Sequence, residues 1–311
     1  MPVFAPPDIL VLAGGGVLGE AWMTGVLAGI EDATGADLRR TESFVGTSAG
    51  SIVAASLAAG RSPRRPAEGA PGAAPARSSG DDDDGTVNGG PGLRGALRTA
   101  GAAAWASTAP AASAALTLGT PGGALVRAAA LARMPSEHRS LGDLRARVER
   151  WGARFDGRLR VCAVDRRSGR RVVFGAPGAP GAEVADAVVA SCSIPWVFEP
   201  VSIGGREYVD GGVWSVTNLD AAPAGRDTQV LCLDVLSGLD PGARGMTAMR
   251  RAFRVAAELE TQSLRRRGAH VLRIGPDRAA ADVLGPDLMD PTPRDAALAA
   301  GFRQGAVLAG G

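Results

Sequence analysis

The chain has few of the residues on which several classes of protein depend. Of its 311 residues only three are cysteine and only two are histidine. Cys162, Cys192 and Cys232 are odd in number, widely spaced and set in apolar stretches, which argues against a disulfide framework or a metal site. We expect them to be small buried hydrophobic side chains in a protein of a reducing compartment.

Neither an excess of one charge nor a long apolar run stands out. The 34 basic and 32 acidic residues are spread along the chain and leave a net charge of +2, so no footprint for nucleic acid is visible. The first apolar run, residues 9–13, has no basic leader and is too short for a signal peptide or a membrane span. We expect a cytoplasmic protein whose contact with membranes is at most peripheral. Nothing in the sequence indicates an oligomeric state.

Two strand–turn–helix units open the chain. Hydrophobic residues make up 45% of the sequence, which is enough for a sizeable core. In each unit a short apolar run ends in a glycine-rich turn and a helical pattern follows, a βαβα opening. The predicted strands are 8–13 and 43–45, and the predicted helices are 18–32 and an alanine-rich stretch that reaches about Ala59.

The composition changes after this opening. Residues 60–92 are rich in Pro, Gly, Ser and Ala and carry four consecutive aspartates at 81–84, which predicts a disordered insert. Residues 93–135 are rich in Ala and Leu and are interrupted by prolines, which suggests short apolar helices and a lid-like segment. We predict that both belong to a single domain spanning residues 1–311.

Regular structure resumes at residue 159. Two strands around a Ser-Gly turn have the chemistry of a hairpin, and helices and buried strands then alternate. The whole pattern predicts an α/β protein with a sheet between helix layers. The predicted strands are 159–164, 171–174, 229–236 and 271–274, and the predicted helices are 182–191, 246–267 and 293–308.

Ser48 is the first candidate functional residue. Residues 46–50 read Gly-Thr-Ser-Ala-Gly between a strand and a helix. A tight turn there lifts the hydroxyl out of the sheet, and the small residues Gly46 and Gly50 let the backbone bend and the substrate approach. The alternative is a plain structural turn, because this pentapeptide is common in glycine-rich proteins. With its context, the run predicts a nucleophilic serine.

The glycine loop at residues 14–19 is the second candidate. Its sequence, Gly-Gly-Gly-Val-Leu-Gly, stands at the N-terminus of a predicted helix, where free amides and the helix dipole favour negative charge. The amides of Gly14, Gly15 and Gly16 are therefore candidates for an oxyanion hole. The alternative is a strand–helix turn that needs glycine for its shape alone.

The same loop also fits a dinucleotide-binding fingerprint, through Gly14, Gly16 and Gly19. That fingerprint needs an acidic residue at the end of the second strand, and here the second strand ends in the serine turn. Asp37 lies at the right distance but in a predicted loop. The dinucleotide site stays a minor alternative.

A serine nucleophile needs a base to take its proton, and histidine is the usual one. His138 lies in a polar stretch and His270 precedes a buried strand, and neither position indicates a catalytic base. A triad of Ser48, Asp210 and His270 has the chain order of α/β-hydrolases. However, several strands precede the serine turn in that fold and only one precedes it here.

Asp210 is the better candidate base. It ends a predicted strand that runs into Gly211 and Gly212, where its carboxylate can point into a cleft. A positioned and partly desolvated aspartate can act as a base. The alternative is an aspartate that merely forms an Asp-Gly turn.

Taken in order, the glycine loop, the serine run and the Asp-Gly-Gly turn resemble the patatin-like phospholipase family. Two further segments are similar to the family, and together the similarity covers about residues 8–60 and 159–308. One precedes the Asp-Gly turn and the other lies near the end of the chain. These segments are residues 190–201 and 300–305.

The resemblance implies a three-layer α/β/α fold with a mostly parallel central sheet. It implies a dyad of Ser48 as nucleophile and Asp210 as base, an oxyanion hole of glycine-loop amides, and hydrolysis of fatty-acyl esters of lipids without a metal or cofactor. Two features depart from the family: Leu18 stands where it usually carries Arg or Lys, and residues 60–158 match no family motif. A non-catalytic lipid-binding protein of the same fold is therefore the main alternative.

Overall fold

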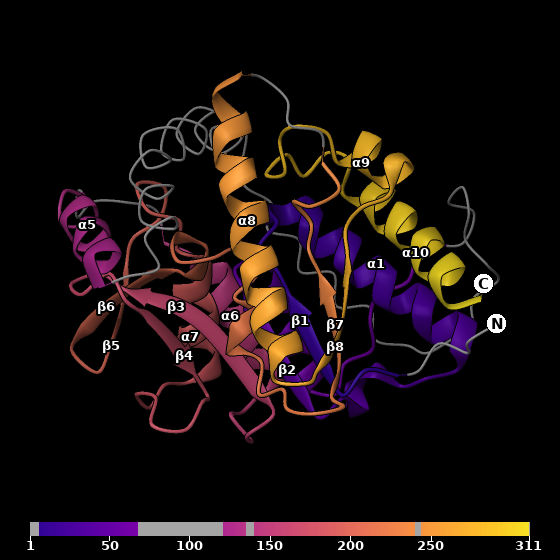
Figure 1. Ribbon diagram of the computed structural model, residues 1–311, viewed down its shortest axis with the longest axis horizontal. Coiled ribbons are helices and arrows are strands. Elements are labelled where there is room, and N and C mark those ends of the chain that lie inside the picture. Colours follow the sequence, from indigo (N-terminus) through magenta and orange to yellow (C-terminus); the bar gives the residue numbers. More distant parts are fainter. Residues whose placement is uncertain (1–5, 68–120, 135–139, 240–243, 311) are drawn as a thin grey trace.

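The computed structural model describes residues 6–67, 121–134, 140–239 and 244–310. A single mixed sheet crosses the molecule and helices lie on both of its sides (Figure 1). Most of the predicted insert and lid-like segment, together with His138, lies outside the described residues. No helix in the described ranges is long and apolar enough to cross a membrane.

The central strands of the sheet are parallel. Hydrogen-bonded neighbours follow the order β5-β6-β3-β2-β1-β7-β8, and β4 also pairs with β3. The five neighbouring strands β3, β2, β1, β7 and β8 are parallel to one another. β4 and β6 run antiparallel to β3, and β5 runs antiparallel to β6. The bounds are β1 Ile9–Leu12, β2 Ser43–Thr47, β3 Leu159–Asp165, β4 Arg171–Phe174, β5 Val201–Ile203, β6 Arg206–Asp210, β7 Gln229–Leu233 and β8 His270–Ile274.

Side chains alternate between the two faces of each strand, and this alternation creates two cores. Leu10 and Leu12 of β1 belong to the larger core, with side chains of α1, α2 and α7, whereas Ile9 and Val11 pack into the smaller one with Leu264 of α8. The predicted three-layer α/β fold is therefore confirmed. The helices are α1 Gly16–Thr34, α2 Ala49–Ala58, α5 Pro121–Leu131, α6 Gly142–Trp151, α7 Val184–Cys192, α8 Arg244–Arg266, α9 Arg278–Leu284 and α10 Arg294–Gly310.

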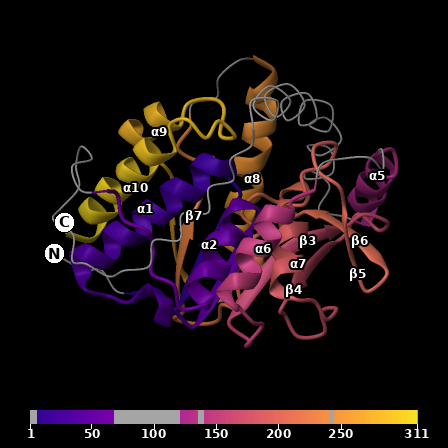
Figure 2. The same ribbon diagram turned by 180° about the vertical axis from the view of Figure 1, so that it is seen from behind.

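The two sides of the sheet are visible in opposite views. α8 lies across one face in Figure 1, and α2, α6 and α7 lie on the other face in Figure 2. α1 and α10 lie side by side in both views, and the indole N–H of Trp22 donates to Oε1 of Gln304 at 2.9 Å between them. The C-terminal helix therefore supports the helix that begins at the glycine loop.

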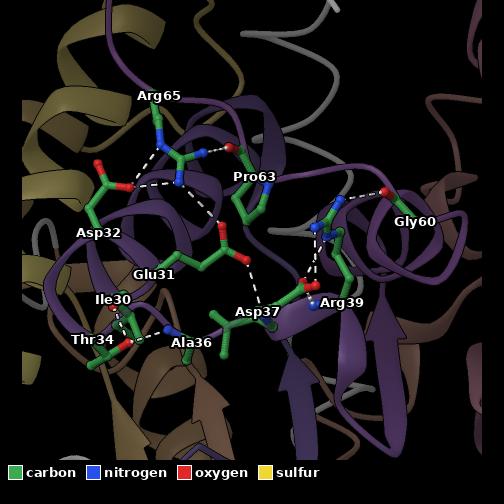
Figure 3. A network of polar contacts seen from close by, with 11 residues as sticks. Ile30, Glu31, Asp32, Thr34, Ala36, Asp37, Arg39, Gly60, Pro63 and Arg65 are labelled. Atoms are coloured by element: carbon green, nitrogen blue, oxygen red, sulfur yellow. Dashed lines mark hydrogen bonds and ion pairs between the residues drawn. The ribbon is translucent and has the colours of Figure 1, made fainter. Parts of the chain in front are cut away.

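The segment that follows α2 is attached to the far end of α1 (Figure 3). Arg65 donates to Asp32 at 2.6 Å and to Glu31 at 3.4 Å, and the other oxygen of Glu31 accepts from the amide of Leu38. Residues 61–67 contain neither helix nor strand. The first residues of the predicted insert are thus held by ion pairs.

Candidate active site

Ser48 alone forms the turn between β2 and α2. β2 ends at Thr47 and α2 begins with the next residue but one, so the chain reverses at Ser48, whose φ is +50° and ψ −124°. A Cβ on Gly50 would overlap the carbonyl oxygen of Leu12, and one on Gly46 would overlap the backbone of α2. Both glycines are therefore required by close backbone approach. Ser48 is partly exposed although its neighbours in the chain are buried.

Replacing Ser48 by glycine is expected to stabilise the fold by about 1 kcal/mol, because a positive φ strains any residue with a Cβ by about 1–3 kcal/mol. Chemical denaturation measures the change. Ser56→Gly in the ordinary helical backbone of α2 is the control, and it should destabilise by about 0.5–1 kcal/mol. A loss of stability in Ser48→Gly as large as that of the control would show that the turn is not strained.

The sheet brings Ser48 and Asp210 together through their shared neighbour β3. Cys162 pairs with Thr47 of β2 and also with β4, and Ala163 pairs with Asp210 of β6 and also with β4. A strand residue has one neighbour on each edge, so β4 occupies one edge of β3 while β2 and β6 share the other. The two strands end at consecutive positions of β3, about 3.3 Å apart along it. Ser48 follows the end of one strand and Asp210 ends the other.

The carboxylate of Asp210 is buried, and only one of its two oxygens has a hydrogen-bond partner among the described residues. Asp210 is 1% exposed, and Oδ1 of its carboxylate accepts from the amide of Gly212 at 2.7 Å. Burial raises the pKa of Asp210 to about 7, against smaller lowering effects of the Gly212 amide and the Ser48 hydroxyl. The register of the sheet places this carboxylate next to Ser48, and Oδ2 has no hydrogen-bond partner within the described residues. An acceptor oxygen is thus free beside the serine.

The glycine loop lies against the serine. A Cβ on Gly14 would stand 3.5 Å from Cβ of Ser48. The amide of Gly14 donates to the carbonyl of Val216 at 2.9 Å, so it is not free for an oxyanion. The amides of Gly15 and Gly16, at the N-terminus of α1, have no acceptor among the residues that the structure describes. Of the three amides proposed from sequence, two therefore remain available.

Leu18 and the remaining glycines of the loop are parts of the core. Leu18 is fully buried and its amide donates to the carbonyl of Leu288 at 3.1 Å. A Cβ on Gly15 would stand 2.6 Å from Val235, and one on Gly19 would stand 3.1 Å from it. The structural and the functional interpretations of this loop are therefore compatible, and the position of the family's cation is filled by an apolar side chain.

The C-terminal end of α7 holds both candidate residues, which the sequence did not indicate. Oγ of Ser191 accepts from the amide of Ser48 at 2.8 Å and donates to the carbonyl of Cys162 at 2.6 Å. The carbonyl of Ser193 accepts from the amide of Asp210 at 2.9 Å. The only signal in the sequence was the similarity of residues 190–201 to the family.

The structure does not assemble the two alternative sites. His270 begins β8, which is separated from β2 by β1 and β7, and its exposed ring lies 3.8 Å from Asp227. Asp37 lies past the far end of α1 from the glycine loop, and Arg39 occupies its carboxylate (Figure 3). Among the described residues no three His, Cys, Asp or Glu side chains gather closely enough to hold a metal ion.

A serine at a strand–helix turn, set beside a buried carboxylate in an α/β sheet, is typical of α/β enzymes that use a serine nucleophile. The model of the patatin-like phospholipase family matches residues 10–223, and the chain belongs to that family. This membership supports lipid acyl hydrolase activity in general.

Several solved structures are also similar to the chain. The crystal structure of VipD from Legionella pneumophila aligns over 98% of this chain and 67% of that one, at 15% identity and a TM-score of 0.40. No curated protein sequence matches the chain.

Proposed function

We propose that the protein is a serine acyl-hydrolase that cleaves fatty-acyl ester bonds of lipids, phospholipids included, through an acyl-Ser48 intermediate. The observation that carries this proposal is the pairing of a strained, partly exposed serine with the unpartnered oxygen of a buried aspartate. Such a pair supplies a nucleophile and a base without histidine.

In the first half of the reaction Asp210 takes the proton of the Ser48 hydroxyl as its oxygen attacks the ester carbonyl. The tetrahedral oxyanion forms beside the N-terminus of α1, where the amides of Gly15 and Gly16 and the helix dipole stabilise it. Asp210 then returns the proton to the departing alcohol, which leaves the acyl group on Ser48. A pKa of about 7 suits a group that must both accept and donate this proton.

In the second half water takes the place of the alcohol. Asp210 accepts a proton from the water as the water oxygen attacks the acyl-enzyme. When the second oxyanion collapses, the bond between the acyl carbon and Ser48 breaks, Asp210 returns the proton to the Ser48 oxygen, and the fatty acid is released. This scheme uses no metal or cofactor. Because the acyl chains of such substrates are held in membranes or micelles, we expect the protein to meet them by peripheral contact with a lipid surface.

The test is covalent labelling together with a substrate panel. The wild-type protein should react with a fluorophosphonate probe, and peptide mass spectrometry should place the adduct on Ser48. Phospholipid, lysophospholipid and neutral glycerolipid micelles, with released fatty acid as the product measured, then identify the ester class. Vesicle binding without any label or fatty acid release would instead favour a non-catalytic lipid-binding protein.

A further inference from the structure

A group of buried polar side chains lies next to the Ser48–Asp210 pair, in the segment between β6 and β7. Ser215, Thr217 and Asn218 are buried there, and Glu260 reaches the segment from α8. Buried polar groups are costly unless they are paired. The proposed chemistry uses none of these side chains, so their contacts need another explanation.

The side-chain amide of Asn218 joins the ends of the two strands that carry the dyad. Its Nδ2 donates to the carbonyl of Ser215 in its own segment at 2.5 Å, to Oγ1 of Thr47 at 3.1 Å and to the carbonyl of Gly211 at 3.3 Å. Thr47 directly precedes Ser48, and Gly211 directly follows Asp210. Among the described strands, β2 and β6 each pair with β3 and not with each other. The amide therefore bridges the two strand ends where no backbone ladder does.

The amide group is fixed in orientation. Its Oδ1 accepts from Nη1 of Arg171 at 3.1 Å, and Arg171 is held in turn by a two-pronged ion pair with Asp220. A guanidinium has only donors, so it requires the oxygen of Asn218 on its side and directs the NH₂ group towards Thr47. The backbone of Asn218 has a φ of +46°, a left-handed conformation that Asn tolerates better than most residues.

Glu260 holds the residues on both sides of Asn218. Its Oε2 accepts from the hydroxyl of Thr217 at 2.5 Å and from the amide of Leu219 at 2.8 Å. Burial raises the pKa of Glu260, and the carboxylate of Asp220 raises it further. Glutamine, which keeps an acceptor oxygen without a charge, is therefore the conservative replacement.

We propose that Asn218 is a positioning residue that sets the separation of Ser48 and Asp210, and that Glu260 holds Asn218 in place for this role. The proposal rests on the proposed function, because it concerns the geometry of the same dyad. A displacement of about 1 Å between reacting groups can cost about a hundredfold in rate, so a bridge between the two strand ends acts on the chemical step and not on substrate binding.

Asn218→Gly is the sharpest test, because glycine accepts the positive φ without strain and removes only the amide. We expect a kcat and a rate of fluorophosphonate labelling lower by roughly ten- to a hundredfold, with KM within about twofold. The control is Asp227→Gly, which changes another non-glycine residue of positive φ, in an exposed turn. That variant should react like the wild type.

Variants of Glu260 test the second part of the proposal. Glu260→Gln should keep most of the activity, Glu260→Ala should lower kcat nearly as far as Asn218→Gly, and the double variant should be no slower than Asn218→Gly alone. Glu258→Ala is the control on the same helix, since Glu258 is half exposed and its carboxylate accepts from Arg273 and Gln262. It should leave kcat unchanged.

The outcomes separate this inference from the proposed function. If the wild type is labelled at Ser48 and Asn218→Gly is labelled equally fast, the positioning role is overturned and the proposed function stands. A fall in thermal stability of Asn218→Gly with unchanged kcat of the folded protein does the same, because it assigns the bridge to folding. A wild type that neither labels nor hydrolyses any ester removes the proposed function and the positioning role with it.

Discussion

Asp210→Asn is expected to lower kcat/KM for ester hydrolysis by about a thousandfold, within the range of about 10²–10⁴ for loss of a general base. Asparagine keeps an oxygen that can accept from the amide of Gly212, so the turn should survive. It has no basic oxygen for the proton of Ser48, so the attack of the hydroxyl is no longer assisted. Steady-state hydrolysis of a p-nitrophenyl ester measures the loss.

The pH profile of the wild type should report the same carboxyl group. Asp210 acts as a base only when it is ionised, and burial raises its pKa to about 7. We therefore expect kcat/KM to rise with pH through about 7 and then to level off. A flat profile from about pH 5 to pH 9 would contradict a rate that depends on Asp210.

The stability of Asp210→Asn should change in the opposite direction to its activity. The pKa of Asp210 is higher in the folded state than the unfolded value of about 3.9, so its contribution to stability is full below about pH 4 and is lost as the pH rises through 7. Asparagine stays neutral throughout. The variant should therefore gain in Tm over the wild type at pH 8 and should gain less at pH 5.

Asp165→Asn is the matched control for this effect. Asp165 is also buried at the end of a strand, but the amide and hydroxyl of Ser168 and the guanidinium of Arg206 hold its pKa below the usual range despite its burial. Because the pKa of Asp165 is lower in the folded state than in the unfolded state, the ionised carboxylate stabilises the fold at every pH above the unfolded pKa. Asp165→Asn should therefore lose stability at pH 8 and keep its activity. Equal stability changes in the two variants would show that burial of Asp210 does not strain the fold.

The sequence predicted those parts of the site that depend on local pattern. The serine turn and the glycine loop follow from short apolar runs broken by glycine, and each lies within a few residues of its supporting strand and helix. β3 and β4 form the predicted antiparallel hairpin, and α1 begins two residues before the predicted position. The Asp-Gly-Gly turn indicated Asp210 as a candidate base, and the resemblance to a family then implied its pairing with Ser48.

The contacts that support the site could not be predicted, because they join distant residues. Ser191 is 143 positions from Ser48, and Asn218 is 171 positions from Thr47. A serine near a helix end or an asparagine in a loop has no pattern that reveals such a partner. The hydrogen bond from the Gly14 amide to the carbonyl of Val216 could not be predicted for the same reason. It depends on how the segment after β6 folds back onto the glycine loop.

Gly301→Ala is expected to destabilise the fold by about 3 kcal/mol, although alanine is the better helix former by about 1 kcal/mol. α1 and α10 contact each other through glycines on both helices. A Cβ on Gly301 would overlap the carbonyl oxygen of Trp22, and a Cβ on Gly25 would overlap that of Leu298. Because the overlapped atoms belong to the backbone, only a movement of one helix relieves the contact. Chemical denaturation measures the loss.

Gly310→Ala separates packing from helix propensity, because Gly310 belongs to the same helix and a Cβ there meets nothing within 4 Å. That variant should be neutral or slightly stabilised. α1 begins at Gly16, whose amide we propose for the oxyanion hole, so movement of α1 in Gly301→Ala should also slow labelling of Ser48. Normal stability together with normal labelling would show that the two helices can separate without cost. A loss of stability with unchanged labelling would show instead that the glycine loop is held by its contacts with Val235 and Leu288.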